Sequence, residues 1–331
     1  MKQVVLKTAI DHKPRAHDFA LIEADRPDCP DDGVLVKLEH VSLDPYVGSR
    51  LRGRHMGEPA PEPGVEAIPG HGVGRVAETR SGNHTEGDLV YVMGAGWREY
   101  AAAPASDARV IEPGGVSPSV YLGALGMPGL TAWAGVTQLA RSGEGDVVLV
   151  DAAAGAVGGS VGQIAKARGA KTVIGIAGGS EKCTLVTERY GFDACFDYRA
   201  EGWRERLAEA AGQGVSVHFE NVSVDMLTIG LSHMRAYGRA VLCGLAAHYH
   251  DDAPAPGLPV GLVIGKRASV YGLVVYDFYD RWDAFLDECR PLAKDGRLTI
   301  AEDVADGLEN APKVFQRLID GANIGKALIS L

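Results

Sequence analysis

One segment constrains the fold more than any other. Residues 147–177 run through a strand, a glycine turn, a helix and a second strand without a break. The apolar start of this segment is typical of a strand buried on both faces. Gly155 and Gly158 follow, with Ala153 where the first glycine of a Gly-x-Gly-x-x-Gly turn usually stands. Gly155 lets the backbone approach a pyrophosphate, Gly158 lets the next helix pack closely, and the free N–H groups at the helix start favour phosphate. The unit therefore predicts a dinucleotide site for a nicotinamide or flavin cofactor.

Length and composition suit a protein of two globular domains. The 331 residues exceed what one core usually holds, and 46% hydrophobic with 23% charged residues is ordinary for such a chain. The net charge of −10, without a sustained run of Lys or Arg, argues against nucleic acid and an anionic membrane as partners. No apolar stretch approaches the roughly 20 residues of a membrane span, so we expect no membrane partner.

Cysteine use and the N-terminus bear on the compartment. The five cysteines are scattered and form no Cys-x-x-Cys pair, which indicates neither a disulfide framework nor a cysteine-rich zinc site. Reduced thiols used as small apolar side chains are the simpler interpretation. The chain begins Met-Lys-Gln-Val-Val-Leu-Lys-Thr, a strand-like alternation without the marks of a signal peptide. The expected location is the cytoplasm.

The chain changes character near residue 120. Before it, short β-like runs broken by Gly, Pro and Asp suggest a twisted barrel-like unit, at residues 34–39, 72–78, 88–93 and 99–102. Beyond it, expected strands alternate with expected helices, which predicts a parallel sheet covered on both faces. These strands are at residues 147–150, 172–176, 194–196, 216–220, 239–243 and 268–275, and the helices at residues 181–190, 202–211, 224–234 and 282–295. A helix at residues 311–320, a turn and a last strand that can return to the N-terminal unit close the chain.

The residue that ends the second strand of the Rossmann unit distinguishes NAD from NADP. An NAD site usually places Asp or Glu there to hold the ribose hydroxyls. This chain has Ala177, so no carboxylate repels a 2′-phosphate, and Lys182 supplies a positive charge for one. Lys182 can also be a solvated lysine in the first turn of a helix, but the missing acid favours the phosphate role. The sequence predicts NADP(H) rather than NAD(H).

The layout of a β unit, a Rossmann unit and a C-terminal return resembles the medium-chain dehydrogenase/reductase superfamily. Its zinc-dependent members carry a cysteine after an early strand, a Gly-His-Glu sequence and a lobe of four closely spaced cysteines. The first two places here hold residues 40–45 (His-Val-Ser-Leu-Asp-Pro) and residues 70–72 (Gly-His-Gly), and the cysteine lobe is missing. His71 alone cannot hold a catalytic zinc, which needs three protein ligands. We therefore expect no metal, and a structural role for His71.

The chain is more similar to zinc-free members, the prostaglandin reductases and alkenal double-bond reductases, a group that includes curcumin reductases. The matching segments follow the family's order along nearly the whole chain: Asp44-Pro45-Tyr46, residues 126–132, 154–158, 162–166, 177–182 and 191–193, Asp197-Tyr198, residues 219–222, Cys243-Gly244 and residues 323–326. The resemblance implies an α/β fold with a GroES-like β-barrel catalytic domain at residues 1–120, completed by residues 300–331, and a Rossmann NADP-binding domain at residues 121–299. It also implies NADPH-dependent reduction of the carbon–carbon double bond of α,β-unsaturated ketones or aldehydes.

The resemblance further implies a cofactor site, residue by residue. The pyrophosphate would lie at the glycine turn, the 2′-phosphate at Lys182 and Tyr198, and the nicotinamide beside the segments that follow the fifth and sixth strands. The implied cofactor contacts are Ala154, Gly155, Ala156, Val157, Gly158, Lys182, Tyr198, Asn221, Cys243, Gly244, Leu245, Tyr249, Leu273, Val274, Val275 and Asn323.

Two departures from the family's sequence bear on this site. The usual Phe-Asp-Asn-Val-Gly-Gly is Phe-Glu-Asn-Val-Ser-Val at residues 219–224, and losing both glycines stiffens a turn that approaches the cofactor. The usual Asp-Pro-Tyr-Met-Arg is Asp-Pro-Tyr-Val-Gly at residues 44–48, which changes one wall of the substrate opening. Substrate specificity therefore need not follow the named members.

Two tyrosines are the catalytic candidates. Hydride addition to the β-carbon leaves negative charge on the carbonyl oxygen, and a hydrogen-bond donor aimed at that enolate lowers the barrier. Tyr46 and Tyr249 can each donate, since a phenol of pKa about 10 stays protonated at neutral pH, and Tyr249 falls at the family's substrate-site tyrosine. Each can instead be a packing aromatic. The proton for the α-carbon can come from tyrosine, the cofactor's ribose hydroxyl or water.

Sequence alone leaves other activities open. A zinc-free NADPH quinone oxidoreductase would share the cofactor site, and a cofactor-sensing protein is the non-enzyme alternative. An alcohol dehydrogenase is disfavoured, because neither zinc ligands nor a Tyr-x-x-x-Lys pair is present to polarise the oxygen. The strand at residues 268–275 is a suitable edge for joining two sheets across a twofold axis, so we expect a homodimer.

Overall fold

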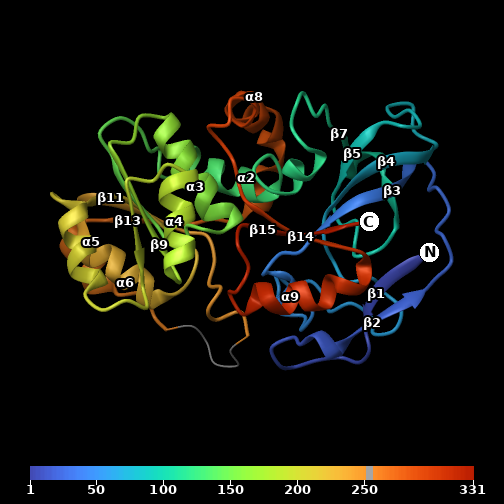
Figure 1. Ribbon diagram of the computed structural model, residues 1–331, viewed down its shortest axis with the longest axis horizontal. Coiled ribbons are helices and arrows are strands. Elements are labelled where there is room, and N and C mark those ends of the chain that lie inside the picture. The colour runs from blue at the N-terminus through green and yellow to red at the C-terminus, as the bar shows by residue number, and fades with distance from the viewer. Residues whose placement is uncertain (251–255) are drawn as a thin grey trace. The chain divides into compact units, whose positions relative to one another are not determined.

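The computed structural model describes residues 1–250 and 256–331 (Figure 1). The loop expected around residues 248–259 therefore lies partly outside the described residues. The chain forms two compact units: Met1–Leu122 together with Glu302–Leu331, and Gly123–Ala301. In the described residues, no helix is both long enough and apolar enough to cross a bilayer.

The first unit is built on a mixed β-sheet with the strand order β14-β15-β3-β4-β5-β7, in which β6 also pairs with β3. Its strands are β3 (Gly33–Ser42), β4 (Gly72–Thr79), β5 (Leu89–Val92), β6 (Tyr100–Pro104), β7 (Ala108–Val110), β14 (Glu302–Asp306) and β15 (Lys326–Ser330), and β1 (Lys2–Leu6) pairs separately with β2 (Phe19–Glu23). Val34, Val36, Trp97 and Ile329 are fully buried in its core. The C-terminal strand β15 runs antiparallel to β3, with Leu328 opposite Ser42, which confirms the predicted return.

Short helices complete the first unit. They are α1 (Val47–Arg50) and α9 (Ala311–Ile319), and α9 falls on the predicted helix at residues 311–320. Between α1 and β4 the backbone forms turns and isolated bridges, in agreement with the many Gly and Pro residues there. Strands β2 and β14 were not expected from the sequence, because each has only five residues, of which at most one is buried.

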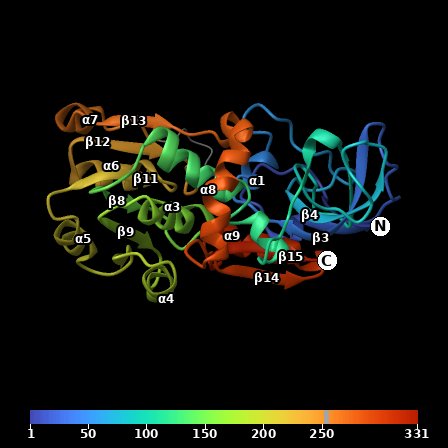
Figure 2. The same ribbon diagram turned by 90° about the horizontal axis from the view of Figure 1, so that it is seen from above.

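The second unit is a parallel sheet with the strand order β10-β9-β8-β11-β12-β13. Figure 2 shows β9, β8, β11, β12 and β13 side by side. The strands are β8 (Val147–Val150), β9 (Thr172–Ala177), β10 (Ala194–Asp197), β11 (Val215–Glu220), β12 (Met234–Leu242) and β13 (Ser269–Gly272). Numbered along the chain, this is the 3-2-1-4-5-6 order of a dinucleotide-binding Rossmann sheet, which confirms the predicted fold class.

Helices cover both faces of this sheet, with α3 and α4 on one side and α5 and α6 on the other (Figure 1). On the second face, Leu149, Ile174 and Ile176 of the sheet pack against Trp203 and Leu207 of α5. The helices are α2 (Met127–Trp133), α3 (Ala156–Ala167), α4 (Ser180–Thr184), α5 (Trp203–Ala211), α6 (Val224–His233), α7 (Val260–Lys266) and α8 (Trp282–Lys294). Apolar contacts on both faces explain why the strand residues read as nearly continuous apolar runs.

Two elements of the second unit differ from the expectation. Strand β13 ends at Gly272, whereas the sequence predicted a strand through residue 275, because the apolar run continues into a 3-10 helix at Val275–Arg281. Helix α7 was not expected, since Gly261 and Gly265 lie within its seven residues and glycine disfavours a helix interior. Periodicity cannot by itself say where pairing in a sheet stops.

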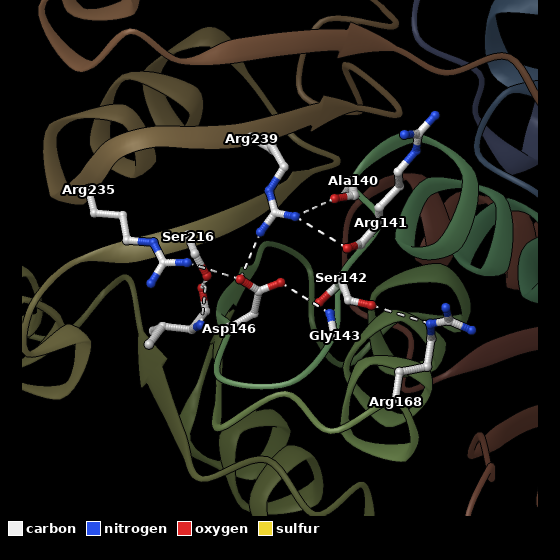
Figure 3. A network of polar contacts seen from close by, with 10 residues as sticks. Ala140, Arg141, Ser142, Gly143, Asp146, Arg168, Ser216, Arg235 and Arg239 are labelled. Carbon is white, nitrogen blue, oxygen red and sulfur yellow. Dashed lines mark hydrogen bonds and ion pairs between the residues drawn. The ribbon is translucent and has the colours of Figure 1, made fainter.

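A buried carboxylate fixes the amino-terminal edge of the sheet (Figure 3). Asp146, which is 6% exposed, precedes β8 and accepts a bond of 2.7 Å from Arg239 and one of 3.2 Å from Arg235, both on β12. Its other oxygen accepts the N–H of Gly143 at 3.1 Å, and Arg239 also donates to the carbonyl of Ala140 at 2.7 Å. One side chain thus links β8 and β12, the two neighbours of β11.

We predict that Asp146→Asn lowers the free energy of unfolding by about 2 kcal/mol, because the buried Asp146 side chain loses the charge that binds two partly exposed arginines. Urea denaturation followed by circular dichroism measures this. The matched control is Asp287→Asn, an exposed position on α8, which is expected to change the same quantity by less than about 0.5 kcal/mol. Equal effects of the two substitutions would contradict the role of Asp146.

Candidate functional site

The carboxyl-terminal edge of the Rossmann sheet gathers most of the predicted site residues. Because its strands are parallel, their carboxyl ends meet at one edge, and ligands of such sheets bind there. The residues that follow β8, β9, β10, β11, β12 and β13 include respectively Gly155, Lys182, Tyr198, Asn221, Cys243 and Leu273. Segments separate in sequence are thus brought to one side of the sheet.

The glycine turn after β8 has the tight geometry that the sequence predicted. Ala152 adopts a left-handed conformation with φ of 48°, and Gly155 is the N-cap of α3. A Cβ on Gly158 would lie 2.5 Å from the carbonyl oxygen of Ala152, so only glycine fits. Ala153 is accommodated because it faces Gly175 of β9, where an added Cβ would lie 2.8 Å from that of Ala153. The first helical turn of α3, from Ala156, presents free N–H groups at this turn.

Two cations and one aromatic ring lie after β9 and β10, where the adenosine end of a dinucleotide would bind. Lys182 on α4 is half-buried, and its pKa is lowered by burial first and then by the charge of Arg199. The Arg199 guanidinium stands 5.4 Å from the ring centre of Tyr198 and donates to its hydroxyl at 3.4 Å. Tyr198 in turn packs against Gly178, where an added Cβ would lie 2.9 Å from the ring. Two cationic side chains that follow neighbouring parallel strands favour an anionic group at this end of the edge.

Asp197 connects the backbone before Lys182 with the backbone at Arg199. Its carboxylate accepts the N–H of Gly179 at 2.9 Å and the N–H of Arg199 at 3.0 Å. These backbone bonds lower its pKa. One carboxylate therefore holds the loop before Lys182 and the loop that carries Arg199.

The turn after β11 connects three segments of the edge. The Asn221 side chain donates to the carbonyl of Asp151, at the start of the glycine turn, at 2.9 Å. The carbonyl of Asn221 accepts the N–H of Ala246 at 3.2 Å, and that of Val222 accepts the N–H of Ala247 at 3.0 Å. The segment after β12 thus rests on the turn that carries Asn221.

Tyr249 is positioned by this same segment. Its hydroxyl lies over Gly244, where an added Cβ would be 2.8 Å away. Burial first, and then the charges of Cys243 and Glu220, raise the pKa of Tyr249 to about 12, while a backbone bond at Leu245 opposes them. Burial likewise raises the pKa of Cys243 to about 12. Both groups stay protonated at neutral pH, so Tyr249 is a hydrogen-bond donor and Cys243 is not a nucleophilic thiolate.

The last segment of the edge follows β13. Leu273 donates its N–H to the carbonyl of Leu242 at 2.9 Å and is buried, while Val274 and Val275 are partly exposed. Tyr279 lies 5.6 Å from Tyr276 and 6.0 Å from Trp282, measured between ring centres. Tyr279 thus connects Tyr276 to the first residue of α8.

Tyr46 and Asn323 belong to the other unit. Tyr46 is the N-cap of α1, and its ring centre lies 4.9 Å from that of His55. Asn323 precedes β15 and donates to the carbonyl of Gly325 at 2.8 Å. Neither is among the residues that the Rossmann edge brings together, and their roles toward cofactor and substrate stay predictions.

The residues at the family's zinc positions do not fit a metal ion. His71 accepts the N–H of Gly94 at 3.4 Å, and burial lowers its pKa. Ser42 donates to Asp44, and the Lys326 ammonium binds Asp44 at 2.5 Å and the carbonyl of Leu43 at 2.9 Å. The Asp44 carboxylate, whose charge acts on His71, is thus already paired with the buried Lys326 ammonium. In the described residues, no group of three or more His, Cys, Asp and Glu side chains is arranged to hold a metal.

Comparisons with known proteins agree with this geometry. The family model described as "N-terminal domain of oxidoreductase" matches residues 2–111, and that described as "Zinc-binding dehydrogenase" matches residues 156–290. The chain is 36% identical to the NADP(+)-dependent 2-alkenal reductase of Nicotiana tabacum, over 99% of this chain and 96% of that one. It is 35% identical to the NADPH-dependent curcumin reductase of Escherichia coli, over 96% of this chain and 92% of that one.

The chain belongs to the prostaglandin reductase and alkenal double-bond reductase family. The resemblance drawn from its motifs is therefore confirmed. Among solved structures, CurA from Vibrio vulnificus in complex with NADPH superposes with a TM-score of 0.90 at 32% identity, covering 100% of this chain and 99% of that one.

Two residues of the site escaped the sequence analysis. Arg199 is one, since a single arginine after a strand has no sequence signature. Its place becomes clear only when β10, which precedes it, pairs with β9, which precedes Lys182. Glu220 is the other: it was noted only as a variant of the family's aspartate, whereas its carboxylate bonds the turn that carries Asn221. For Arg199 the available signal was its place directly after Tyr198, which the family resemblance had assigned to the 2′-phosphate.

Proposed function

We propose that this protein is an NADPH-dependent reductase of the carbon–carbon double bond in α,β-unsaturated ketones and aldehydes. The observation that carries the proposal is that Lys182 and Arg199 follow the neighbouring strands β9 and β10 at one end of the edge, while the Tyr249 hydroxyl lies over Gly244 after β12. The two cations select a dinucleotide that carries a 2′-phosphate. The tyrosine supplies a neutral hydrogen-bond donor for a substrate oxygen that gains negative charge. Relatives of nearly full length that are named for these reactions add support.

The chain's own groups fit NADPH. The crowded Gly158 and the helix start at Ala156 form a cradle for the diphosphate, in which a Cβ would collide with the backbone. Lys182 and Arg199 would hold the 2′-phosphate, with Tyr198 against the adenosine. Ala177 ends β9 without the carboxylate that an NAD site would use. When bound, NADPH supplies a hydride to the substrate's β-carbon.

Tyr249 is the proposed donor to the substrate's carbonyl oxygen. As the hydride arrives, charge moves to that oxygen, and a preformed donor stabilises the resulting enolate. The raised pKa keeps the phenol protonated through the neutral range, and Gly244 leaves room for its hydroxyl. We propose Tyr46, from the β unit, as a second polar group of the substrate site, and Asn323 as a further cofactor contact.

A parallel assay of NADPH oxidation tests the proposed reaction. A simple enone, an enal, a quinone and an alkyl ketone are supplied separately to the purified protein. Turnover of the enone and enal with formation of the saturated carbonyl product is expected. Turnover of the quinone alone would replace the proposal by a quinone oxidoreductase, and NADPH binding without any turnover would favour a sensor.

Lys182→Ala is expected to raise KM for NADPH by about tenfold or more and KM for NADH by less than about threefold, because only NADPH carries the 2′-phosphate. Steady-state kinetics with both cofactors measure the two constants. Lys171→Ala, at an exposed lysine of the same unit, is the matched control and should change neither constant. Equal increases for both cofactors would refute the phosphate role.

Tyr249→Phe is expected to lower kcat for the enone by about 100-fold, while KM for NADPH changes little, because one donor to a developing oxyanion is lost. Tyr237→Phe, at a tyrosine that is 75% exposed, controls for the removal of a hydroxyl. Since the pKa of Tyr249 is about 12, donation is lost only as pH rises toward that value. A wild-type kcat that falls with a midpoint below about pH 9 would argue against this residue as the donor.

We propose a homodimer formed along β13. This strand is at the edge of the Rossmann sheet, and beside it α7 exposes Val260 (55% exposed) and Ile264 (69% exposed). An unpaired edge with apolar neighbours suits a second copy across a twofold axis. Light scattering should give about twice the chain mass of 34.9 kDa, and a particle of the single mass would contradict the dimer.

We also propose a cytoplasmic location. All five cysteines are free thiols, a state that a reducing compartment preserves. Cell fractionation with an antibody to the protein tests it, and recovery in an oxidising compartment would contradict it.

A further inference from the structure

A buried acidic cluster beneath the Asn221 turn has no role in the proposed chemistry. Glu220 is the last residue of β11 and is 1% exposed. Asp151, directly after β8, and His218, on β11, are fully buried and joined by a contact of 2.9 Å. All three lie at the point of the sheet where the strand order reverses, next to the glycine turn.

Glu220 holds the backbone of the turn that follows it. One carboxylate oxygen accepts the N–H of Val222 and the N–H of Ser223, each at 2.5 Å. These bonds are not needed to cap α6, because the Ser223 hydroxyl already accepts the N–H of Met226 at 3.2 Å. The Glu220 side chain thus restrains residues 221–223, a turn that ends in Ser223, where the resemblance places the first of two family glycines.

The turn at residues 221–223 is bonded to the segment after β8 and to the segment after β12. Asn221 bonds the carbonyl of Asp151 with its side chain and the N–H of Ala246 with its own carbonyl. Glu220 also accepts, through its backbone carbonyl, the N–H of Cys243 at 2.9 Å. A shift of this turn would move Asn221 and the segment that carries Tyr249 together.

From this arrangement we infer that Glu220 is a positioning residue for the dinucleotide: its ionised carboxylate keeps the Asn221 turn in the conformation that receives NADPH, and protonation releases it. The inference rests on the proposed function, because it concerns affinity for that cofactor. Ionised carboxylates accept hydrogen bonds much more strongly than neutral acids, so the two N–H bonds weaken when the proton arrives.

The groups around Glu220 place its titration near neutral pH. Burial first, and then the charge of Asp151, raise the pKa of Glu220 to about 7, against the N–H bonds of Val222 and Ser223 and the charge of His218. Asp151 raises the pKa of His218 against the effect of burial. Cys243 and Tyr249 also face Glu220, and both stay protonated in this range.

The sign of the pH effect follows from which form binds. If NADPH binds the ionised form better, the pKa of Glu220 is lower in the complex than in the free protein. Affinity is then full above about pH 7 and declines as pH falls through that value. Simple repulsion between Glu220 and the cofactor's phosphates would give the opposite slope.

The test compares dissociation constants for NADPH between the wild-type protein and Glu220→Gln, measured by quenching of tryptophan fluorescence across pH. The ratio of the two constants cancels the titration of the 2′-phosphate near pH 6, which both proteins share. We expect the variant to bind about tenfold more weakly at about pH 8.5, the two constants to lie within about twofold of each other at about pH 6, and to converge at about pH 5. Glu220→Asp, which keeps an ionisable acceptor, should retain a wild-type direction of pH dependence.

Controls separate the outcomes. Glu209→Gln, at an exposed glutamate of α5, should bind as the wild type at every pH, and circular dichroism should give the same folded spectrum for every variant. A ratio that does not vary with pH, or one that favours the variant at high pH, would overturn the inference. A wild-type protein that binds NADPH at no pH would contradict the proposed function itself, and the inference with it.

Discussion

The parallel pairing of β8 with β11 is the interaction on which the rest of the candidate site depends. Val148, Leu149 and Val150 stand opposite Val217, His218 and Phe219, and the order of strands along the sheet reverses at this pair. The connections therefore leave the pair in opposite directions and open the edge where a dinucleotide can lie. Before β8, Asp146 binds Arg239 of β12, on the other side of β11, and at the carboxyl ends the Asn221 side chain, after β11, donates to the carbonyl of Asp151, after β8.

Charge is distributed unevenly along this edge, and the distribution follows the chemistry required at each place. After β9 and β10 stand two cations, the half-buried Lys182 and the exposed Arg199, in a chain of net charge −10. At the other end, burial raises the pKa of Tyr249 and of Cys243, so both side chains stay neutral. They face Glu220, whose pKa is about 7.

The sequence predicted what local physics decides. Buried strands such as β8 and the glycine turn came out at their observed places because apolar runs and crowded glycines have strong local causes. Elements with weak local signals were not predicted correctly. Strand β14 is a short edge strand, and α7 contains two glycines. Strand β13 ends where its pairing with β12 ends, although the apolar run continues. Arg199 and Glu220 become site residues only in the fold, because β10 pairs with β9 and because the Glu220 carbonyl accepts the N–H of Cys243 after β12.

In the proposed reaction, hydride reaches the β-carbon of a conjugated carbonyl compound. Incubation of the protein with an enone and NADPH that carries deuterium at the transferring position tests this step directly, with the product analysed by proton NMR and mass spectrometry. A saturated carbonyl product labelled at the β-carbon is expected. Deuterium at the carbonyl carbon of an alcohol, or an unlabelled product formed while NADPH is consumed, would contradict it.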